Sequence, residues 1–330
     1  MSNIGWFAWE PGLFGNTTTS AGGAAWTAYL FERFVENGHH VIWLPDTSLV
    51  PQNSRAGSIG DCDIVFFCWR WQMPEKPERH QMYLDQLSMV SSASRLGIPI
   101  VVHDEDHKIS YEDRRTLDFY GATIARPELF PEYGVKSLIF PNPYEFKQPH
   151  LPFATTTDLV YVGNNYERYI QTRQFLRPFS SSYKVTLYGN WLEPSSERES
   201  PEKVLADFPR VEFPGRLPQE KIIDTLWNAN STIHLFRPSY ARNGFITIRW
   251  AEAAAAGIPA FVPWEMALPE DIEQKLTNAG LLVEDGDTMV RNYAAMTPMK
   301  WVRALEVQRK FVREYMTAIP WLELVDQLAR

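Results

Sequence analysis

The feature that most constrains the fold is an alternation of short apolar segments with helix-like segments, which occurs twice along the chain. In the first half the apolar segments lie at residues 3–9, 39–45, 63–71 and 98–103. In the second half they lie at 158–163, 183–189, 231–236 and 258–263. Strands that alternate with helices predict parallel sheets covered on both faces. The sequence therefore predicts an α/β protein with two Rossmann-like, doubly wound lobes.

A Pro-rich stretch, PNPYEFKQPHLPFATTT, separates the two halves and is the best candidate for a linker. We predict an N-terminal lobe at 1–150, a C-terminal lobe at 151–300, and a helical segment at 301–330 that has a kink at Pro320 and packs back on the N-terminal lobe. Ligands of such folds bind at the carboxyl edges of the strands. The two lobes are therefore expected to face a cleft that holds the ligand.

Composition narrows the class of protein. The chain has 330 residues, of which 45% are hydrophobic, and a formal net charge of −8, so a surface that binds nucleic acid everywhere is excluded. Most of the 12 Trp residues are expected in the core. Cys62 and Cys68 lack the spacing of a metal or redox motif and read as free thiols. There is no signal-peptide pattern and no run of 18 apolar residues, which predicts a cytoplasmic protein without a membrane span.

The Gly-rich segment from Gly12 to Gly23 has neither the Gly-x-Gly-x-x-Gly spacing of a dinucleotide site nor a P-loop. Ser20, Gly22 and Gly23 precede a helix pattern, and backbone N–H groups at a helix N-terminus favour an anion or an acceptor hydroxyl. A structural turn explains the same residues equally well.

The most informative segment is RPSYARNGFITIRWAEAAAAGIPAFVP, residues 237–263, which predicts a strand, a loop, a helix over 245–256 ended by Gly257, and a strand. Arg249 and Glu252 are three residues apart and share one face of that helix. A guanidinium suits phosphate oxygens and a carboxylate suits a ribose diol, so the pair fits a nucleoside diphosphate. The alternative is a salt bridge on a solvated helix face.

This segment resembles the C-terminal lobe of GT-B glycosyltransferases, most closely the CgeB-like (spore-maturation-protein-like) group, whose Arg-x-x-Glu precedes small residues, a Gly and a strand. Three further stretches are similar to parts of that lobe: YVGNNYERY, LYGNW and FPGRLPQEKIIDTLWNANSTIHL. The resemblance covers about 158–265. In the first lobe, SAGGAAWTAYLFERFVENGHHV is similar to the start common to GT-B enzymes.

The resemblance implies a nucleotide-sugar donor, with a UDP-sugar first, no tightly bound cofactor and no metal. Arg249 would hold the diphosphate and Glu252 the ribose hydroxyls. The remaining donor-binding residues it implies are Asn243 and Gly244 for phosphates or sugar, Arg216 and Leu217 for the base, and Gly163 and Arg168 beside the phosphates. The Glu-x7-Glu pair of many retaining relatives lacks its first Glu near Asn243, which leaves the stereochemical outcome open.

The stretch HDEDH, residues 103–107, follows a predicted strand and allows three interpretations. Its D-x-D motif is that of metal-dependent GT-A enzymes, but those enzymes have one lobe. Consecutive acidic residues on an extended segment also point to alternate sides, which fits one shared metal ion poorly. As the catalytic base of the acceptor side, Asp104 or His103 comes first, then Asp106 and His107. A capped polar loop is the third interpretation.

A hexose transfer to an acceptor hydroxyl is the function expected from these features. Two alternatives are a nucleotide-sugar epimerase on the same fold and a non-catalytic nucleotide-sugar binder. The acceptor is open: a hydroxymethylated base in DNA is one candidate, because CWRWQMPEKPERH and the Asp-Arg-Arg at 113–115 combine basic and aromatic residues. The net charge of −8 speaks against DNA.

Overall fold

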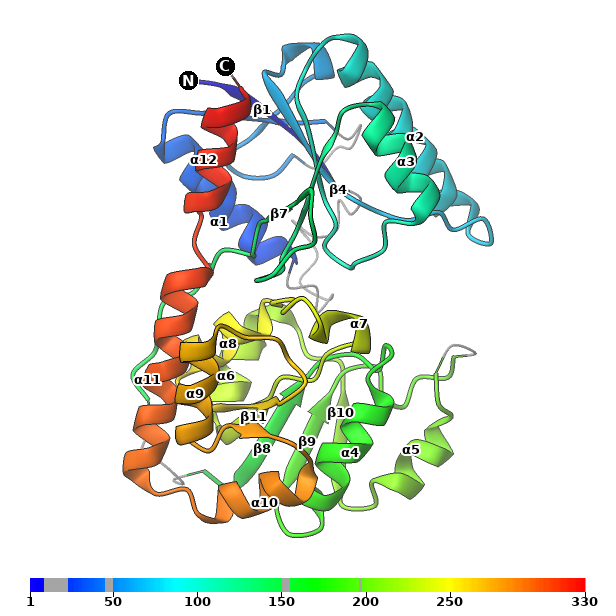
Figure 1. The fold of residues 1–330 in the computed structure, drawn as a ribbon. Coiled ribbons are helices and arrows are strands. Elements are labelled where there is room, and N and C mark those ends of the chain that lie inside the picture. The colour runs from blue at the N-terminus through cyan, green and yellow to red at the C-terminus, as the bar shows by residue number, and fades with distance from the viewer. Residues whose placement is uncertain (9–22, 45–49, 150–154, 196–197, 330) are drawn as a thin grey trace. The chain divides into compact units, whose positions relative to one another are not determined.

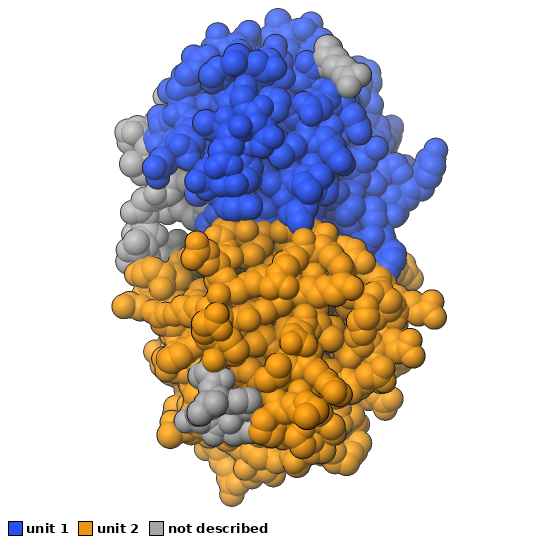
Figure 2. Space-filling model, turned by 90° about the vertical axis from the view of Figure 1, so that its left-hand side faces the viewer, with its two compact units in different colours: residues 1–16, 23–141, 317–330 blue, residues 17–22, 142–316 orange. Residues whose placement is uncertain are grey.

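The two-lobed α/β architecture predicted from the sequence is confirmed. The computed structural model describes residues 1–8, 23–44, 50–149, 155–195 and 198–329, and the chain divides into two compact units (Figures 1 and 2). Unit 1 contains the N-terminal strand, Gly23–Pro141 and the segment from Thr317 onward, and unit 2 contains Asn142–Met316.

Unit 1 is built on a parallel sheet with the strand order β3-β2-β1-β4-β5-β6-β7. Its strands are β1 (Asn3–Phe7), β2 (His40–Trp43), β3 (Arg55–Ala56), β4 (Ile64–Cys68), β5 (Ile100–His103), β6 (Thr123–Arg126) and β7 (Val135–Ser137). Its helices are α1 (Gly23–Glu36), α2 (Pro77–Arg95), α3 (Tyr111–Phe119), α12 (Ile319–Leu328) and the short 3-10 helix η2 (Ile59–Asp61). The strand order reverses between β1 and β4, so ligands are expected beyond their carboxyl ends.

Unit 2 repeats this plan with the order β10-β9-β8-β11-β12-β13, again parallel. Its strands are β8 (Thr157–Val162), β9 (Val185–Tyr188), β10 (Val211–Gly215), β11 (Ala229–Ile233), β12 (Ala260–Pro263) and β13 (Leu282–Val283). Its helices are α4 (Tyr169–Ser180), α5 (Pro201–Asp207), η3 (Gln219–Lys221), α6 (Ile222–Trp227), α7 (Pro238–Ala241), α8 (Arg249–Ala256), α9 (Glu270–Asn278), α10 (Gly286–Ala294) and α11 (Pro298–Tyr315). Here the order reverses between β8 and β11.

The C-terminal segment differs from the prediction of one kinked helix over 301–330. It forms two helices, with α11 in unit 2 against α8, and α12 in unit 1. Pro320 lies in the first turn of α12, where its missing N–H costs no helical hydrogen bond, so it starts a helix instead of bending one. The boundary between units lies at Pro141, nine residues before the predicted 150.

The helix that carries Arg249 starts later than predicted. Instead of covering 245–256, α8 begins at Arg249, because Ile246, Thr247 and Ile248 are β-branched and lose side-chain freedom in a helix. Gly257 ends the helix in the left-handed conformation, with φ 77°, as predicted. Arg249 is consequently in the first turn of α8, at the N-terminus, where the backbone N–H groups have no partner within the helix.

Aromatic side chains form the core of unit 1, and in the described residues of both units together eight Trp side chains are fully buried. Trp321 of α12 packs against Trp6, Trp26 and Phe66, with ring centroids 5.7 to 6.0 Å apart, and its Nε1 donates to the carbonyl oxygen of Ile139 at 3.0 Å. These contacts attach α12 to the sheet of unit 1. None of the helices described above is long and apolar enough to cross a membrane.

Candidate active site

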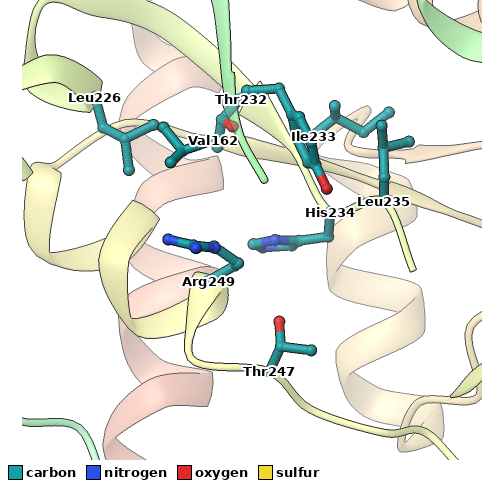
Figure 3. A pocket seen from close by; sticks show the side chains of 9 residues that line it. Val162, Leu226, Thr232, Ile233, His234, Leu235, Thr247 and Arg249 are labelled. Atoms are coloured by element: carbon teal, nitrogen blue, oxygen red, sulfur yellow. The ribbon is translucent and has the colours of Figure 1, made fainter. Parts of the chain in front are cut away.

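The switch point of unit 2 is the best-formed candidate site. Strands β8 and β11 are parallel neighbours, and the chain leaves them at Gly163 and His234 respectively. A small pocket beside their carboxyl ends is lined by Tyr161, Val162, Leu226, Thr232, Ile233, His234, Leu235, Thr247 and Arg249 (Figure 3). Two predicted donor-binding residues, Gly163 and Arg249, are thus brought to the same edge of one sheet.

A close approach of two chain segments shapes this edge. The Gly163 carbonyl oxygen accepts a hydrogen bond from Trp191 Nε1 at 2.9 Å. Gly189 has φ 138°, and a Cβ atom there would lie 2.2 Å from the same carbonyl oxygen. Glycine is therefore required at 189 both by the backbone conformation and by the space available.

Arg249 and Glu252 form an ion pair with each other. The Glu252 side chain is completely buried, while that of Arg249 is 24% exposed. Glu252 also faces Gln219 Nε2 at 3.3 Å, and Gln219 donates to the Tyr144 hydroxyl at 2.8 Å. Burial and the Glu252 carboxylate raise the pKa of Tyr144 above its ordinary value. The salt bridge between Arg249 and Glu252 that the alternative interpretation expected is therefore present. It lies on a buried helix face within a polar network, and not on a solvated helix face.

His234 was not singled out from the sequence. Its side chain is 4% exposed and stacks on Trp250, with ring centroids 4.3 Å apart and an interplanar angle of 16°. Within the described chain neither ring nitrogen has a hydrogen-bond partner. Burial lowers the pKa of His234 to about 3, so the ring is neutral at pH 7. The available signal was its place directly after a buried strand at a switch point.

This burial predicts a pH dependence of stability. An unfolded His titrates near pH 6.5, so between about pH 6.5 and 3 the unfolded chain holds one more proton at residue 234, and stability falls as the pH is lowered. From about pH 7.5 to pH 5 the loss attributable to His234 is about 2 kcal/mol. His234→Phe should lack this loss. Urea unfolding of both proteins at the two pH values measures it, and equal losses in both would contradict it.

The other predicted donor-binding residues lie around the same sheet. Arg216 follows β10 and makes an exposed two-pronged ion pair with Glu193, at 2.6 Å for each contact. Arg168 directly precedes α4 and makes no capping hydrogen bond with its side chain, whose Nη1 donates to the Asn164 carbonyl oxygen at 3.1 Å. Leu217 is half-buried, as is Asn243, and Gly244 is buried with φ 63° in the turn after α7. Their roles toward a donor stay predictions.

The segment 103–107 begins at the last residue of β5 in unit 1, and two of its predicted catalytic side chains are buried. The Asp104 carboxylate accepts from the backbone N–H of Lys108 at 2.7 Å and from Arg126 Nε at 3.1 Å. His103 Nε2 lies 2.9 Å from the Leu138 carbonyl oxygen, and its ring is 4.8 Å from that of Trp321. Both side chains are 0% exposed. In this conformation they hold the loop and the core together, as the capped-loop interpretation expects.

The remaining side chains of this segment are more accessible. Asp106 is 32% exposed and lies 3.1 Å from Arg70 Nη1. His107 is 24% exposed, and its Nε2 is 3.7 Å from Oε1 of the fully buried Glu128. Its backbone has φ 55°, which is uncommon for a residue other than glycine and is typical of functional sites. Burial and the charge of Arg126 lower the pKa of His107, which favours the neutral ring.

The acidic side chains of 104–106 diverge: Asp104 points to Arg126, Glu105 to His103, and Asp106 to Arg70. Among the residues that the structure describes, no three His, Cys, Asp or Glu side chains are grouped to hold a metal ion. Ser20 and Gly22 lie outside the described residues, and Gly23 is the first residue of α1.

Some side chains of the basic and aromatic stretches considered for DNA are buried or paired within unit 1. Trp69 is buried in the core of unit 1, and Arg70 pairs with Asp106. The Asp113 carboxylate accepts from the buried Tyr83 hydroxyl at 2.5 Å, and Arg114 pairs with Asp118. Arg70, Asp113 and Arg114 thus already have partners within unit 1.

Comparison with known proteins gives a partial family match. Residues 168–318, which include α8 and the pocket residues His234, Thr247 and Arg249, match a family model described as glycosyl transferase-like. No curated protein sequence matches the chain.

Solved structures resemble the whole chain in fold. α-Glucosyltransferase in complex with UDP-glucose and DNA containing an abasic site has a TM-score of 0.68 at 12% identity, over 100% of both chains. Phage T4 β-glucosyltransferase with UDP-glucose has a TM-score of 0.67 at 15% identity, over 99% of this chain and 98% of that one. AviGT4, a glycosyltransferase involved in avilamycin A biosynthesis, has a TM-score of 0.59 at 14% identity, over 100% and 98%. The GT-B fold is thereby confirmed, whereas the CgeB-like subgroup stays a prediction.

Proposed function

We propose that the protein is a glycosyltransferase that moves a hexose from a UDP-sugar to an acceptor hydroxyl. The observation that carries this proposal is the pairing of Arg249 with Glu252 at the switch point of unit 2, inside the part of the chain that matches the glycosyl transferase-like model. Two solved proteins of this fold, phage T4 β-glucosyltransferase and an α-glucosyltransferase, are in complex with UDP-glucose, which supports the choice of donor.

The proposed donor site uses side chains that now satisfy one another. Arg249 would leave Glu252 for the diphosphate, and Glu252 would then accept hydrogen bonds from the ribose hydroxyls. Gly163, Arg168, Asn243 and Gly244 would contact the phosphates or the sugar, and Arg216 with Leu217 the base. When the bond between the sugar and the diphosphate breaks, its electrons go to the departing UDP, and the Arg249 guanidinium stabilises that charge.

For an inverting reaction we propose His107 as the base, in the segment where the sequence predicts it. If its Nε2 carries the proton toward Glu128, Nδ1 has a free lone pair that can take the proton of the acceptor hydroxyl. The acceptor oxygen then forms the new bond to the sugar. Asp106, which pairs with Arg70, precedes His107 in the same segment. Asp104 and His103 would hold the segment in place through their buried contacts with Arg126 and the Leu138 carbonyl oxygen.

As acceptor we propose a hydroxymethylated base in DNA. The support is the fold shared with two solved proteins, an α-glucosyltransferase in complex with DNA containing an abasic site and a β-glucosyltransferase described as a DNA-modifying enzyme. AviGT4, which has the same fold, is instead described as involved in avilamycin A biosynthesis. The proposed reaction takes place in the cytoplasm. It needs no metal ion, because the Arg249 guanidinium can supply the positive charge that a metal ion would supply.

The test is UDP release from UDP-glucose with three acceptors: duplex DNA containing a hydroxymethylated pyrimidine, the same duplex unmodified, and none, each with and without EDTA. We expect turnover only with the modified duplex and no effect of EDTA. Loss of turnover with EDTA would overturn metal independence, which matters because phage T4 β-glucosyltransferase has been solved with UDP and Mn²⁺. An isomerised sugar from donor alone would establish an epimerase, and tight donor binding without turnover on any acceptor a binder.

A further inference from the structure

His234 is a buried polar side chain that the proposed donor contacts have not used. Both of its ring nitrogens lack a hydrogen-bond partner in the described part of the protein, although only 4% of the side chain is exposed. Such a group costs free energy unless something pairs with it. A buried unpaired imidazole therefore indicates a partner that the protein alone does not provide.

The position of the ring restricts that partner to the donor pocket. His234 and Arg249 both line it, and in Figure 3 the imidazole points toward the Arg249 side chain, whose guanidinium extends beyond it, while the Thr247 hydroxyl points toward the two side chains. Stacking on Trp250, itself 2% exposed, fixes the plane of the imidazole. A group that enters the pocket to meet the guanidinium would also meet the edge of this ring.

The chemistry of the two side chains points to an oxygen anion. Arg249 has donors only, so a group that binds it must accept hydrogen bonds. A neutral imidazole has one N–H donor, and it can direct that donor at the same acceptor without adding a second positive charge beside the guanidinium. Phosphate oxygens accept several such bonds, and the switch point is where doubly wound sheets bind phosphates.

We propose that His234 donates a hydrogen bond from its ring to a phosphate oxygen of the donor's diphosphate, together with Arg249. This inference rests on the proposed function for the identity of the ligand and adds a binding residue at the strand β11 end. Trp250 acts behind it as the residue that positions the ring.

The test measures binding of uridine, UMP, UDP and UDP-glucose by calorimetry to the whole protein and to His234→Phe, which keeps an aromatic ring on Trp250. A hydrogen bond to a charged group predicts a loss of UDP affinity of about 10-fold to 100-fold, with uridine unchanged. His234→Gln, which restores an N–H donor, should recover part of the loss. If His234→Phe does not fold, His234→Gln against His234→Leu gives the same comparison.

His80→Phe is the matched control. His80 also stacks on an aromatic ring, that of Tyr83 at 6.2 Å and 18°, and one of its ring nitrogens is buried without a partner in the described chain, but it lies in α2 of unit 1. This variant should bind UDP like the wild type. UDP affinity that is unchanged in His234→Phe but lost in Arg249→Ala would overturn the inference and leave the proposed function intact. A loss for UDP-glucose alone would assign His234 to the sugar and also overturn it, whereas a wild-type protein that binds none of the four ligands would overturn the proposed function itself.

Discussion

Arg249→Ala is expected to lower the free energy of unfolding by about 3 to 5 kcal/mol and to abolish binding of a UDP-sugar. The Glu252 carboxylate is completely buried, and Arg249 is its ion-pair partner. Removal of the guanidinium leaves a buried charge whose remaining side-chain contacts in the described part of the chain are Gln219 and Tyr144. The same change removes the positive charge proposed for the diphosphate. Urea unfolding and calorimetry with UDP-glucose measure the two effects separately.

Lys275→Ala provides the matched comparison, because Lys275 pairs with Asp271 on one face of α9 in the same unit, but with both side chains in solvent. An exposed pair of this kind contributes at most about 1 kcal/mol. If Arg249→Ala proved as stable as Lys275→Ala, the ion pair with Glu252 would not be a buried one in solution. Stability lost without any loss of donor affinity would instead restrict Arg249 to a structural role.

His107→Gln is expected to reduce kcat by about 10²-fold to 10⁴-fold, the usual contribution of a general base, with the Kd for UDP-glucose unchanged. Glutamine can still donate toward Glu128, but it has no ring nitrogen that takes up a proton. Asp104→Asn should behave differently. It weakens the buried contact with Arg126 and the hydrogen bonds to the following backbone, so its main effect should be a lower unfolding midpoint.

The pair of variants distinguishes the two candidates for the base. A stable Asp104→Asn protein that has lost kcat, next to a His107→Gln protein that keeps it, would return the role to Asp104, the first choice from the sequence. The pH profile adds a second readout: with His107 as base, kcat should fall as the pH drops through the pKa of that ring, which burial places below its ordinary value.

Much of the fold could be predicted, because strong apolar strands and glycine stops are local signals. The strands at 64–68, 100–103 and 157–162 and the end of α8 at Gly257 follow from such patterns. The short helices α3, α5 and α9 escaped prediction because they are rich in charge and bury few side chains. In α3 only Asp113 and Leu117 are buried, so its apolar periodicity is weak.

The candidate site was harder to predict, because burial and pairing are tertiary properties. Arg249 and Glu252 could be placed on one helix face from their spacing, but that face could have been solvated or buried. The partners Gln219 and Tyr144 come from segments 33 and 108 residues away from Glu252. His234 carries no motif, and only the neighbouring strand and Trp250 make its ring a candidate ligand.

The close approach at Gly189 has a consequence for the alignment of this chain with sequences of low identity. Its backbone conformation and the carbonyl oxygen of Gly163 together leave no room for a Cβ atom, whatever the acceptor or donor of a given protein. Most positions can change their residue type when the identity falls to 12–15%. A position fixed by backbone geometry cannot, provided that the close approach of residues 163 and 189 is kept. The glycine of Leu-Tyr-Gly-Asn-Trp, residues 187–191, is therefore a fixed point from which distant sequences can be brought into register.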